Sequence, residues 1–283
     1  MAYAELRPLS GGPPVHFDAE SDSGLMLGTV DGWYGTPSAK VDLTELSGGN
    51  GASAVSDKAI LYSSRTVTLG VCASRDTYSE LVGLIDSADA LAEKLVTIEV
   101  DGGEGPTTAT GYVQVEWGAG PMPTMNTGTI TVVCPDPRRY GSVEHGVSLS
   151  PGGNSTGGLD LTDERLAFPL AWGAQAASRN VTTMHNAGTS TAYTTIRVQG
   201  GISDVVITNA TTGEELTIPG YIGWQPIVLD SMTRTATIDG VDVTRRIGQR
   251  HFPTIAPGGD TTLALVCSGT NGAVRVTWHD TYI

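Results

Sequence analysis

The chain has 283 residues, a formal net charge of −14 and a pI of about 4.6. This length is enough for one large domain or two ordinary ones, and the acidic balance argues against nucleic acid as the main partner, because phosphates are bound by Lys and Arg. Hydrophobic residues make up 39% of the chain and glycines number 37, a composition typical of turn-rich β structure. No apolar stretch approaches the ~20 residues that cross a bilayer and no signal-peptide pattern opens the chain, so we expect no membrane partner and synthesis in a cytoplasm.

The first half of the chain predicts a mostly β domain. Residues 41–46 (Val-Asp-Leu-Thr-Glu-Leu) alternate between apolar and polar side chains, which predicts a half-buried strand. Residues 47–56 are rich in Gly, Ala, Ser and Asn, and predict a flexible loop of a length that often carries contacts in assemblies. Residues 25–27 and 33–37 are expected to bracket a turn. Further strands are predicted at 59–62, 65–72, 96–100, 111–117 and 129–134.

One long helix is predicted from Thr77 to Leu95. Thr77 and Glu80 have the spacing of a capping box. Apolar residues then recur at steps of three and four, as expected for a helix that lies on a sheet; they are Tyr78, Leu81, Val82, Ile85, Ala88, Ala92 and Leu95.

The stretch that ends this domain is 134–141 (Cys-Pro-Asp-Pro-Arg-Arg-Tyr-Gly). Its two prolines restrict φ and direct the chain out of the preceding strand. Arg138, Arg139 and Tyr140 follow, and because Arg and Tyr are enriched at the centres of interfaces we treat them as candidate contacts with a neighbouring subunit. The alternative is an Arg-capped turn that pairs with acids of its own domain.

The second half predicts a sandwich or jelly roll of short strands. Turn signals such as Asn271-Gly272 and Asp239-Gly240 separate the predicted strands at regular intervals. We therefore divide the chain into a first domain at 1–145, a Gly/Ser/Thr-rich linker at 146–165 and a second domain at 166–283. The strands are predicted at 181–185, 194–198, 205–208, 215–218, 227–229, 235–238, 262–266 and 273–278.

No pattern in the sequence predicts catalysis, a cofactor or a metal site. The carboxylates at 18–24 are spaced somewhat as in calcium loops, but the glycine is one place late and Thr29 stands where a bidentate Glu is needed. No nucleophile elbow or phosphate loop is present. Cys72, Cys134 and Cys267 lie far apart, which favours buried, reduced thiols.

Aromatic residues of the second domain offer one possible glycan site. Trp224 and Trp278 are the candidates for sugar contact, and Trp172, Tyr193 and Tyr221 are the aromatic residues that would accompany them. Tryptophans in a sandwich more often pack in its core or at its rim, and we favour that reading.

Several of these residues give the chain a resemblance to the distal tail (Dit) proteins of bacteriophages with long, non-contractile tails. The first domain resembles the ring-forming belt domain of that family, and the second its galectin-like β-sandwich; together they cover nearly the whole chain. The matching stretches of the first domain are 30–37 (Val-Asp-Gly-Trp-Tyr-Gly-Thr-Pro), 62–69 (Tyr-Ser-Ser-Arg-Thr-Val-Thr-Leu), the helix, and 135–141, which is similar to the end of the domain in phages of actinobacterial hosts. Those of the second are 186–189, 194–198, 229–230, 234–235, 239–240 and 257–259.

The resemblance implies a structural role at the tail tip of the virion, after assembly in the host cytoplasm. Such a minor tail protein forms a homohexameric ring between the tail tube protein and the tail-tip hub of the baseplate. Its outer domains contact other tip or receptor-binding proteins, and DNA passes only as cargo through the channel. The family has no common catalytic residues, so no enzyme activity is implied. Trp33, Tyr34 and Arg65, which lie in the matching stretches, join Arg138, Arg139 and Tyr140 as interface candidates.

Other classes remain open from the sequence. The main alternative is a carbohydrate-binding module or host-surface adhesin of the tail tip, built on the sandwich. A glycan-degrading enzyme needs a pair of carboxylates that no spacing here nominates. A tail-tube subunit lacks a counterpart to the second domain.

Overall fold

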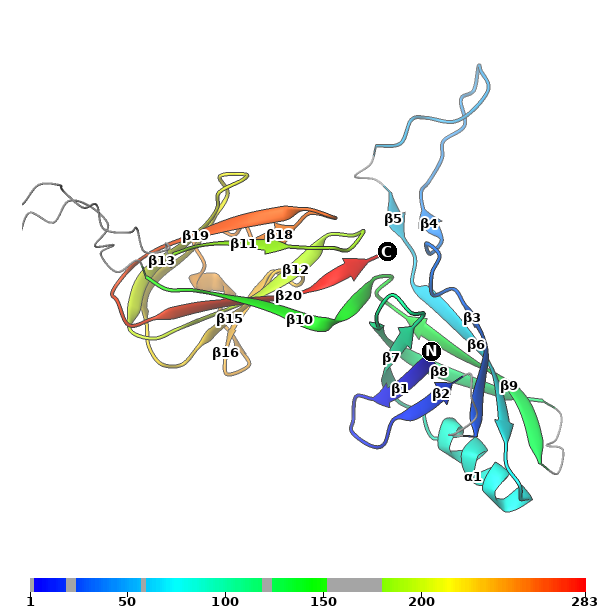
Figure 1. Cartoon of the computed structure of the whole chain (residues 1–283). Coiled ribbons are helices and arrows are strands. Elements are labelled where there is room, and N and C mark those ends of the chain that lie inside the picture. The colour runs from blue at the N-terminus through cyan, green and yellow to red at the C-terminus, as the bar shows by residue number, and fades with distance from the viewer. Residues whose placement is uncertain (1–2, 19–23, 57–59, 119–123, 152–179) are drawn as a thin grey trace, which may run out of the picture. The chain divides into compact units, whose positions relative to one another are not determined.

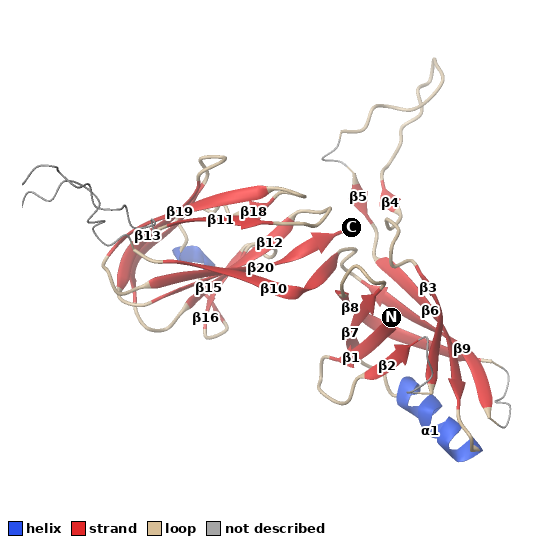
Figure 2. Cartoon of the chain, viewed as in Figure 1, coloured by secondary structure: helices blue, strands red, loops and turns tan. Residues whose placement is uncertain are grey.

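The computed structural model describes residues 3–18, 24–56, 60–118, 124–151 and 180–283. The chain divides into two compact units, of which the first comprises Met1–Ser142 with Tyr282–Ile283 and the second Val143–Thr281. Among the described residues both units are built of strands, and the one α-helix belongs to the first (Figures 1 and 2). The predicted mostly β fold with one helix is therefore confirmed. No helix in the described part of the chain is long and apolar enough to span a membrane.

Seven strands of the first unit form a closed barrel. They follow one another in the order β8-β7-β1-β2-β3-β6-β9, and β8 also pairs with β9, which closes the sheet. All neighbours are antiparallel except β2 and β3, which pair in parallel at Asp18 and Met26. The bounds are β1 (Tyr3–Pro8), β2 (Val15–Asp18), β3 (Leu25–Asp31), β6 (Arg65–Ser74), β7 (Leu95–Asp101), β8 (Thr107–Trp117) and β9 (Met125–Cys134).

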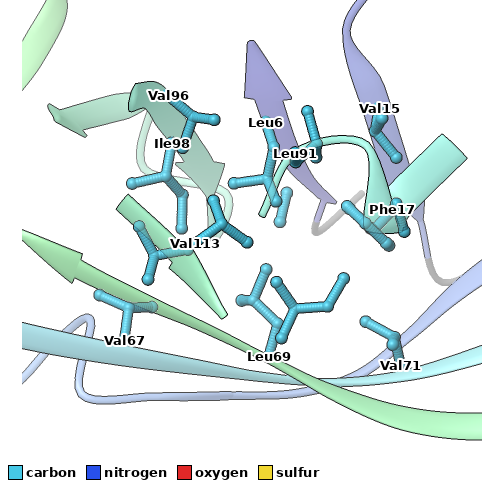
Figure 3. Packing of buried hydrophobic residues seen from close by; sticks show 14 of the residues in the cluster. Leu6, Val15, Phe17, Val67, Leu69, Val71, Leu91, Val96, Ile98 and Val113 are labelled. Carbon is cyan, nitrogen blue, oxygen red and sulfur yellow. The ribbon is translucent and has the colours of Figure 1, made fainter. Parts of the chain in front are cut away.

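The core of the first unit lies inside this barrel (Figure 3). Alternate side chains point inward because successive residues of a strand face opposite sides. On β6 the inward set runs from Val67 to Ala73, and on β7 it runs from Val96 to Val100. Strands β1 and β2 add buried Leu6 and Phe17.

The helix α1 (Tyr78–Asp89) begins as predicted but is shorter than predicted. The backbone N–H of Glu80 donates to the side-chain oxygen of Thr77, which caps the helix. Leu81 and Ala88 are its buried residues. Tyr78 is exposed, and Leu95 is the exposed first residue of β7. The buried face of the helix is therefore shorter at both ends than the predicted apolar stripe.

An arm leaves the barrel between β3 and β6 (Figure 1). Its base is the short pair β4 (Ala39–Lys40) and β5 (Leu61–Tyr62), and a bridge between Glu45 and Ala52 closes its tip. The prediction of a half-buried strand at 41–46 is wrong. This stretch lies in the arm, and Leu43 and Leu46 are exposed. Alternation alone does not supply the neighbouring strand that a sheet requires.

The second unit is a sandwich of two sheets. One has the order β11-β19-β13-β14, and the other runs β10-β20-β12-β15-β16-β17 with β18 paired to β12. Buried residues of both sheets form one core. The bounds are β10 (Arg139–Leu149), β11 (Val181–His185), β12 (Ala192–Gln199), β13 (Ile202–Asn209), β14 (Glu215–Ile222), β15 (Ile227–Asp230), β16 (Thr235–Ile238), β17 (Val241–Asp242), β18 (Thr254–Ile255), β19 (Asp260–Ser268) and β20 (Ala273–Tyr282), with a 3₁₀ turn at Thr244–Arg246.

The joint between the domains differs from the prediction. Residues 146–149, assigned to a linker, are the end of β10. At the other end of β10, Tyr140 pairs with Thr108 of the first unit, and Leu149 is buried in the core of the second. The glycines and serines of this stretch concealed the strand. Most of the predicted linker, and Trp172, lie outside the described residues.

Candidate functional site

The interface candidates of the first unit gather around Arg65, the first residue of β6. Its side chain is 1% exposed. Nη1 donates to the carbonyl oxygens of Gly32, Trp33 and Gly35 at 2.6, 2.8 and 2.8 Å, and Nε donates to that of Pro137 at 2.8 Å. One guanidinium therefore ties the segment that leads from β3 into the arm to the proline turn that ends the barrel.

Gly32 makes this close packing possible. Its φ is +77°, a left-handed conformation that favours glycine. A Cβ atom placed there would lie 2.1 Å from the carbonyl oxygen of Thr66. Any other residue would push the chain away from β6, and with it the carbonyl that Arg65 binds.

Arg139 fills the other side of the cluster. The carbon at the centre of its guanidinium lies 5.7 Å from the ring centroids of Trp33 and Tyr34 and 5.8 Å from that of Tyr282. Trp33 is fully buried, and its indole N–H donates to Thr107 Oγ1 at 3.2 Å. The ring faces supply negative potential to the cation, so the penultimate residue of the chain becomes part of this site.

The turn between Asp136 and Tyr140 is held by its own carboxylate. Asp136 accepts the backbone N–H of Arg138 at 3.1 Å and the hydroxyl of Tyr140 at 2.5 Å. Nη1 of Arg138 lies 3.4 Å from the same carboxylate. For Arg138 the alternative of pairing with an acid of its own domain is thus what the geometry shows.

Burial shapes the electrostatics of the cluster. It lowers the pKa of Arg65, and the nearby charge of Arg139 lowers it further. Burial also lowers the pKa of Arg139 and raises those of Tyr140 and Cys134, the latter to about 11. Nη2 of Arg65 and Nε of Arg139 are buried without a hydrogen-bond partner among the described residues. Carbonyl oxygens surround the Arg65 cation, and aromatic rings surround the Arg139 cation.

The structure sorts the six interface candidates into two groups. Trp33 and Arg65 are buried within the first unit. Their burial corrects the expectation that they offer a contact surface, which rested on the resemblance. Tyr34 is 60% exposed, and Arg138, Arg139 and Tyr140 are partly exposed. Sequence analysis missed Tyr282 and Thr107, for which no local pattern signals a role.

The two candidate glycan contacts, Trp278 and Trp224, also differ in burial. Trp278 is 6% exposed, donates from its indole N–H to the carbonyl oxygen of His185 at 2.8 Å, and stacks on His145 with centroids 5.5 Å apart. It is a packing residue and not a sugar platform, which corrects that candidate. Trp224 is 81% exposed in the loop between β14 and β15, and Tyr221 is exposed as well.

The remaining candidates are a metal site and the three cysteines. The described residues contain no group of three or more His, Cys, Asp or Glu side chains that could hold a metal ion; the acidic stretch at 18–24 lies largely outside them. All three cysteines are free, but only Cys134 is buried, while Cys72 and Cys267 are half-buried.

Solved structures with a similar fold come from phage tail and baseplate proteins. The sequence matches no family model, and no curated protein matches it significantly. Among solved structures, the Dit protein of phage SPP1, described as a paradigm of the hub adsorption apparatus in phages that infect Gram-positive bacteria, superposes with a TM-score of 0.64 at 14% identity and 99% coverage of both chains. Chains in two structures of the phage p2 baseplate in its activated conformation, with Ca and with Sr, give TM-scores of 0.52 and 0.53 at 11% and 12% identity, covering 97% of this chain and 98% of each match. The chain therefore has, over nearly its whole length, the fold of a siphophage Dit protein, as the sequence resemblance implied.

Proposed function

We propose that this chain is a structural subunit of a phage tail tip that forms a homohexameric ring between the tail tube and the tail-tip hub. The observation that carries the proposal is the likeness to SPP1 Dit over 99% of both chains. The likeness supports the proposal because it includes both units and not one domain alone. In this proposal the second, galectin-like unit contacts other tip proteins, and DNA passes through the channel.

The arm of the first unit supports a role in assembly. Leu43, Leu46 and Leu61 are each more than half exposed on it. Apolar side chains on a protruding segment cost solvation free energy until another surface covers them. A ring provides that surface in a regular way, because each subunit offers the same arm to the next.

The Arg65 cluster would hold the arm in a fixed direction. The segment from Gly32 to Gly35 leads into β4, and β5 returns to Arg65 through two residues. At the base of the arm the backbone N–H of Ser63 donates to the carbonyl oxygen of Ser38 at 2.8 Å. A rigid base reduces the conformational entropy lost on assembly, so we assign Trp33 and Arg65 to positioning, and Tyr34, Arg138, Arg139 and Tyr140 to the surface beside the arm.

The test compares arm variants with the natural chain. Leu43→Ser with Leu46→Ser should shift the purified protein from ring to monomer in light scattering at high concentration, with the circular dichroism spectrum unchanged. Val241→Ser, which alters an exposed apolar residue of the second unit, is the matched control and should leave the ring intact. Rings of unchanged mass from the double variant would remove the arm from the interface.

A further inference from the structure

The second unit carries a hollow on the solvent face of the sheet that contains β12 and β20. Its volume is about 470 Å³, within the range of small-molecule sites. All of its lining residues belong to the second unit; they are Glu144, Thr195, Arg197, Gln199, Val228, Ala273, Arg275 and Thr277. It is distinct from the Arg65 cluster and from Trp224.

Two arginines face each other in this hollow. In the antiparallel register of β12 and β20, Arg197 lies directly opposite Arg275, and Thr195 opposite Thr277. Both arginine side chains are exposed. Like charges at directly opposed positions of neighbouring strands destabilise a sheet. The repulsion between Arg197 and Arg275 therefore lowers the stability of the fold, and formation of the sheet does not need this pair.

No described residue of the chain neutralises either guanidinium. Among the residues that the structure describes, the side chains of Arg197 and Arg275 make no hydrogen bond and no ion pair. Glu144 lines the same hollow but forms no ion pair with either arginine. The net charge of the chain is −14, yet two guanidinium groups lie together here with no partner in the described part of the chain. The planar fork of each group matches an oxyanion.

Gly146 lies beside Arg275 and Thr277, two residues that line the hollow. It lies on β10 and has no positive φ, so its backbone does not require glycine. A Cβ atom there would lie 3.6 Å from Nη2 of Arg275 and 3.5 Å from Thr277. A larger side chain would occupy the space over the guanidinium, although glycine weakens the interior of a strand.

The rest of the lining indicates what accompanies the anion. Thr195, Thr277 and Gln199 offer hydroxyl and amide groups, and Val228 and Ala273 are the apolar side chains of the lining. A protein segment would need larger apolar anchors, whereas a polyhydroxylated ligand is matched by such neutral donors and acceptors. We propose that this hollow binds an anionic saccharide, with Arg197 and Arg275 holding its carboxylate or phosphate and the threonines and Gln199 its hydroxyls.

The proposal is tested by titrating the full chain with four probes at one salt concentration. These are trigalacturonate, maltotriose 1-phosphate, the neutral galactotriose, and inorganic phosphate. We expect one or both charged saccharides to bind roughly ten-fold or more tightly than galactotriose and inorganic phosphate. Whichever charged saccharide binds more tightly assigns the oxyanion as carboxylate or phosphate.

Variants connect the binding to this hollow. Arg197→Gln and Arg275→Gln should each weaken binding roughly ten-fold or more, and Gly146→Val should weaken it without a change in net charge. Arg245→Gln, an exposed arginine outside the hollow, should not. Binding of neither charged saccharide, equal binding of galactotriose or inorganic phosphate, tighter binding of hexaglutamate, or an equal effect of Arg245→Gln would each overturn the proposal. Because none of these readouts depends on oligomeric state, they are independent of the ring.

Discussion

Nη1 of Arg65 donates a hydrogen bond to the carbonyl oxygen of Trp33 at 2.8 Å, with both residues buried. This contact joins the first residue of β6 to the segment that enters the arm. The segment that enters the arm is bound by the Arg65 guanidinium, and the segment that leaves the arm ends at Arg65 itself. Charged donors make stronger hydrogen bonds than neutral ones, and a charge buried at such a place is expensive to leave half-satisfied.

Replacing Arg65 should strongly destabilise the first unit. Arg65→Met keeps much of the side-chain volume but leaves four carbonyl oxygens without their donor, and we expect a loss of about 3 kcal/mol or more in the free energy of unfolding. Urea titration of the full chain measures it. The control is Arg7→Met, an exposed arginine of the same unit, with an expected change within about 0.5 kcal/mol. A loss below about 1 kcal/mol for Arg65→Met would contradict the role we assign.

The glycines near this contact provide a matched pair. Gly32→Ala places a Cβ at positive φ and against the Thr66 carbonyl, so we expect a loss of roughly 2 kcal/mol or more. Gly35→Ala, three residues on, meets nothing within 4 Å and has no positive φ. It should change stability by less than about 0.5 kcal/mol. Equal melting temperatures for the two variants would show that the close approach at Gly32 carries no strain.

Local signals in the sequence were sufficient for part of this fold. The capping pattern of Thr77 and Glu80 identified the start of the helix because both partners lie within one turn. Residues 41–46 have an equally clear alternating pattern but form no strand, since the pattern does not say whether a neighbouring strand exists. Conversely, β10 was missed because its glycines and serines resemble a linker, while its pairing partner Thr108 lies far away in the chain.

The site was predicted by residue type but not by position. Arg, Trp and Tyr in the matching stretches led to six candidates that the fold does bring into one region, yet nothing in the sequence distinguished buried Arg65 from exposed Tyr34. Tyr282 could not be found because its contact with Arg139 depends on where the last strand ends. The pairing of Arg197 with Arg275 likewise depends on a strand register that no local pattern encodes.

The thiol of Cys134 should make stability depend on pH in the alkaline range. Burial raises its pKa from the ordinary 9.0 to about 11 in the folded chain. The pKa of Cys134 is higher in the folded chain than in the unfolded chain. The protonated thiol therefore contributes its full share to the free energy of unfolding below pH 9, and this share is lost as the pH rises through 11. At roughly 1.4 kcal/mol per pKa unit the loss is of order 2–3 kcal/mol.

Comparison with Cys134→Ala isolates this effect. Tyr3, whose pKa is raised to about 12 by its hydrogen bond to Glu99, titrates in both proteins and cancels in the difference. We expect urea titrations to show the free-energy gap between the natural chain and the variant narrowing from pH 9 to pH 11. A constant gap would mean that the Cys134 thiol ionises alike in the folded and unfolded states.

Removal of either arginine of the hollow should stabilise the unliganded chain. Arg197→Gln or Arg275→Gln relieves a repulsion between directly opposed like charges, so we expect a gain of about 0.5 kcal/mol at low ionic strength. The gain should shrink in high salt, which screens exposed charges. Arg245→Gln should give no gain. Thermal melting at two salt concentrations measures the effect, and a loss of stability on removing either arginine would mean that the pair supports the sheet.

The most direct measurement of the central claim is electron microscopy of the purified full chain at high concentration, combined with native mass spectrometry. We expect closed rings with a central channel and a single mass that is a small multiple of the 29.4 kDa chain. Both should be lost on Leu43→Ser with Leu46→Ser. Monomers at every concentration, together with no ring of this protein at the tail tip of virions, would contradict it.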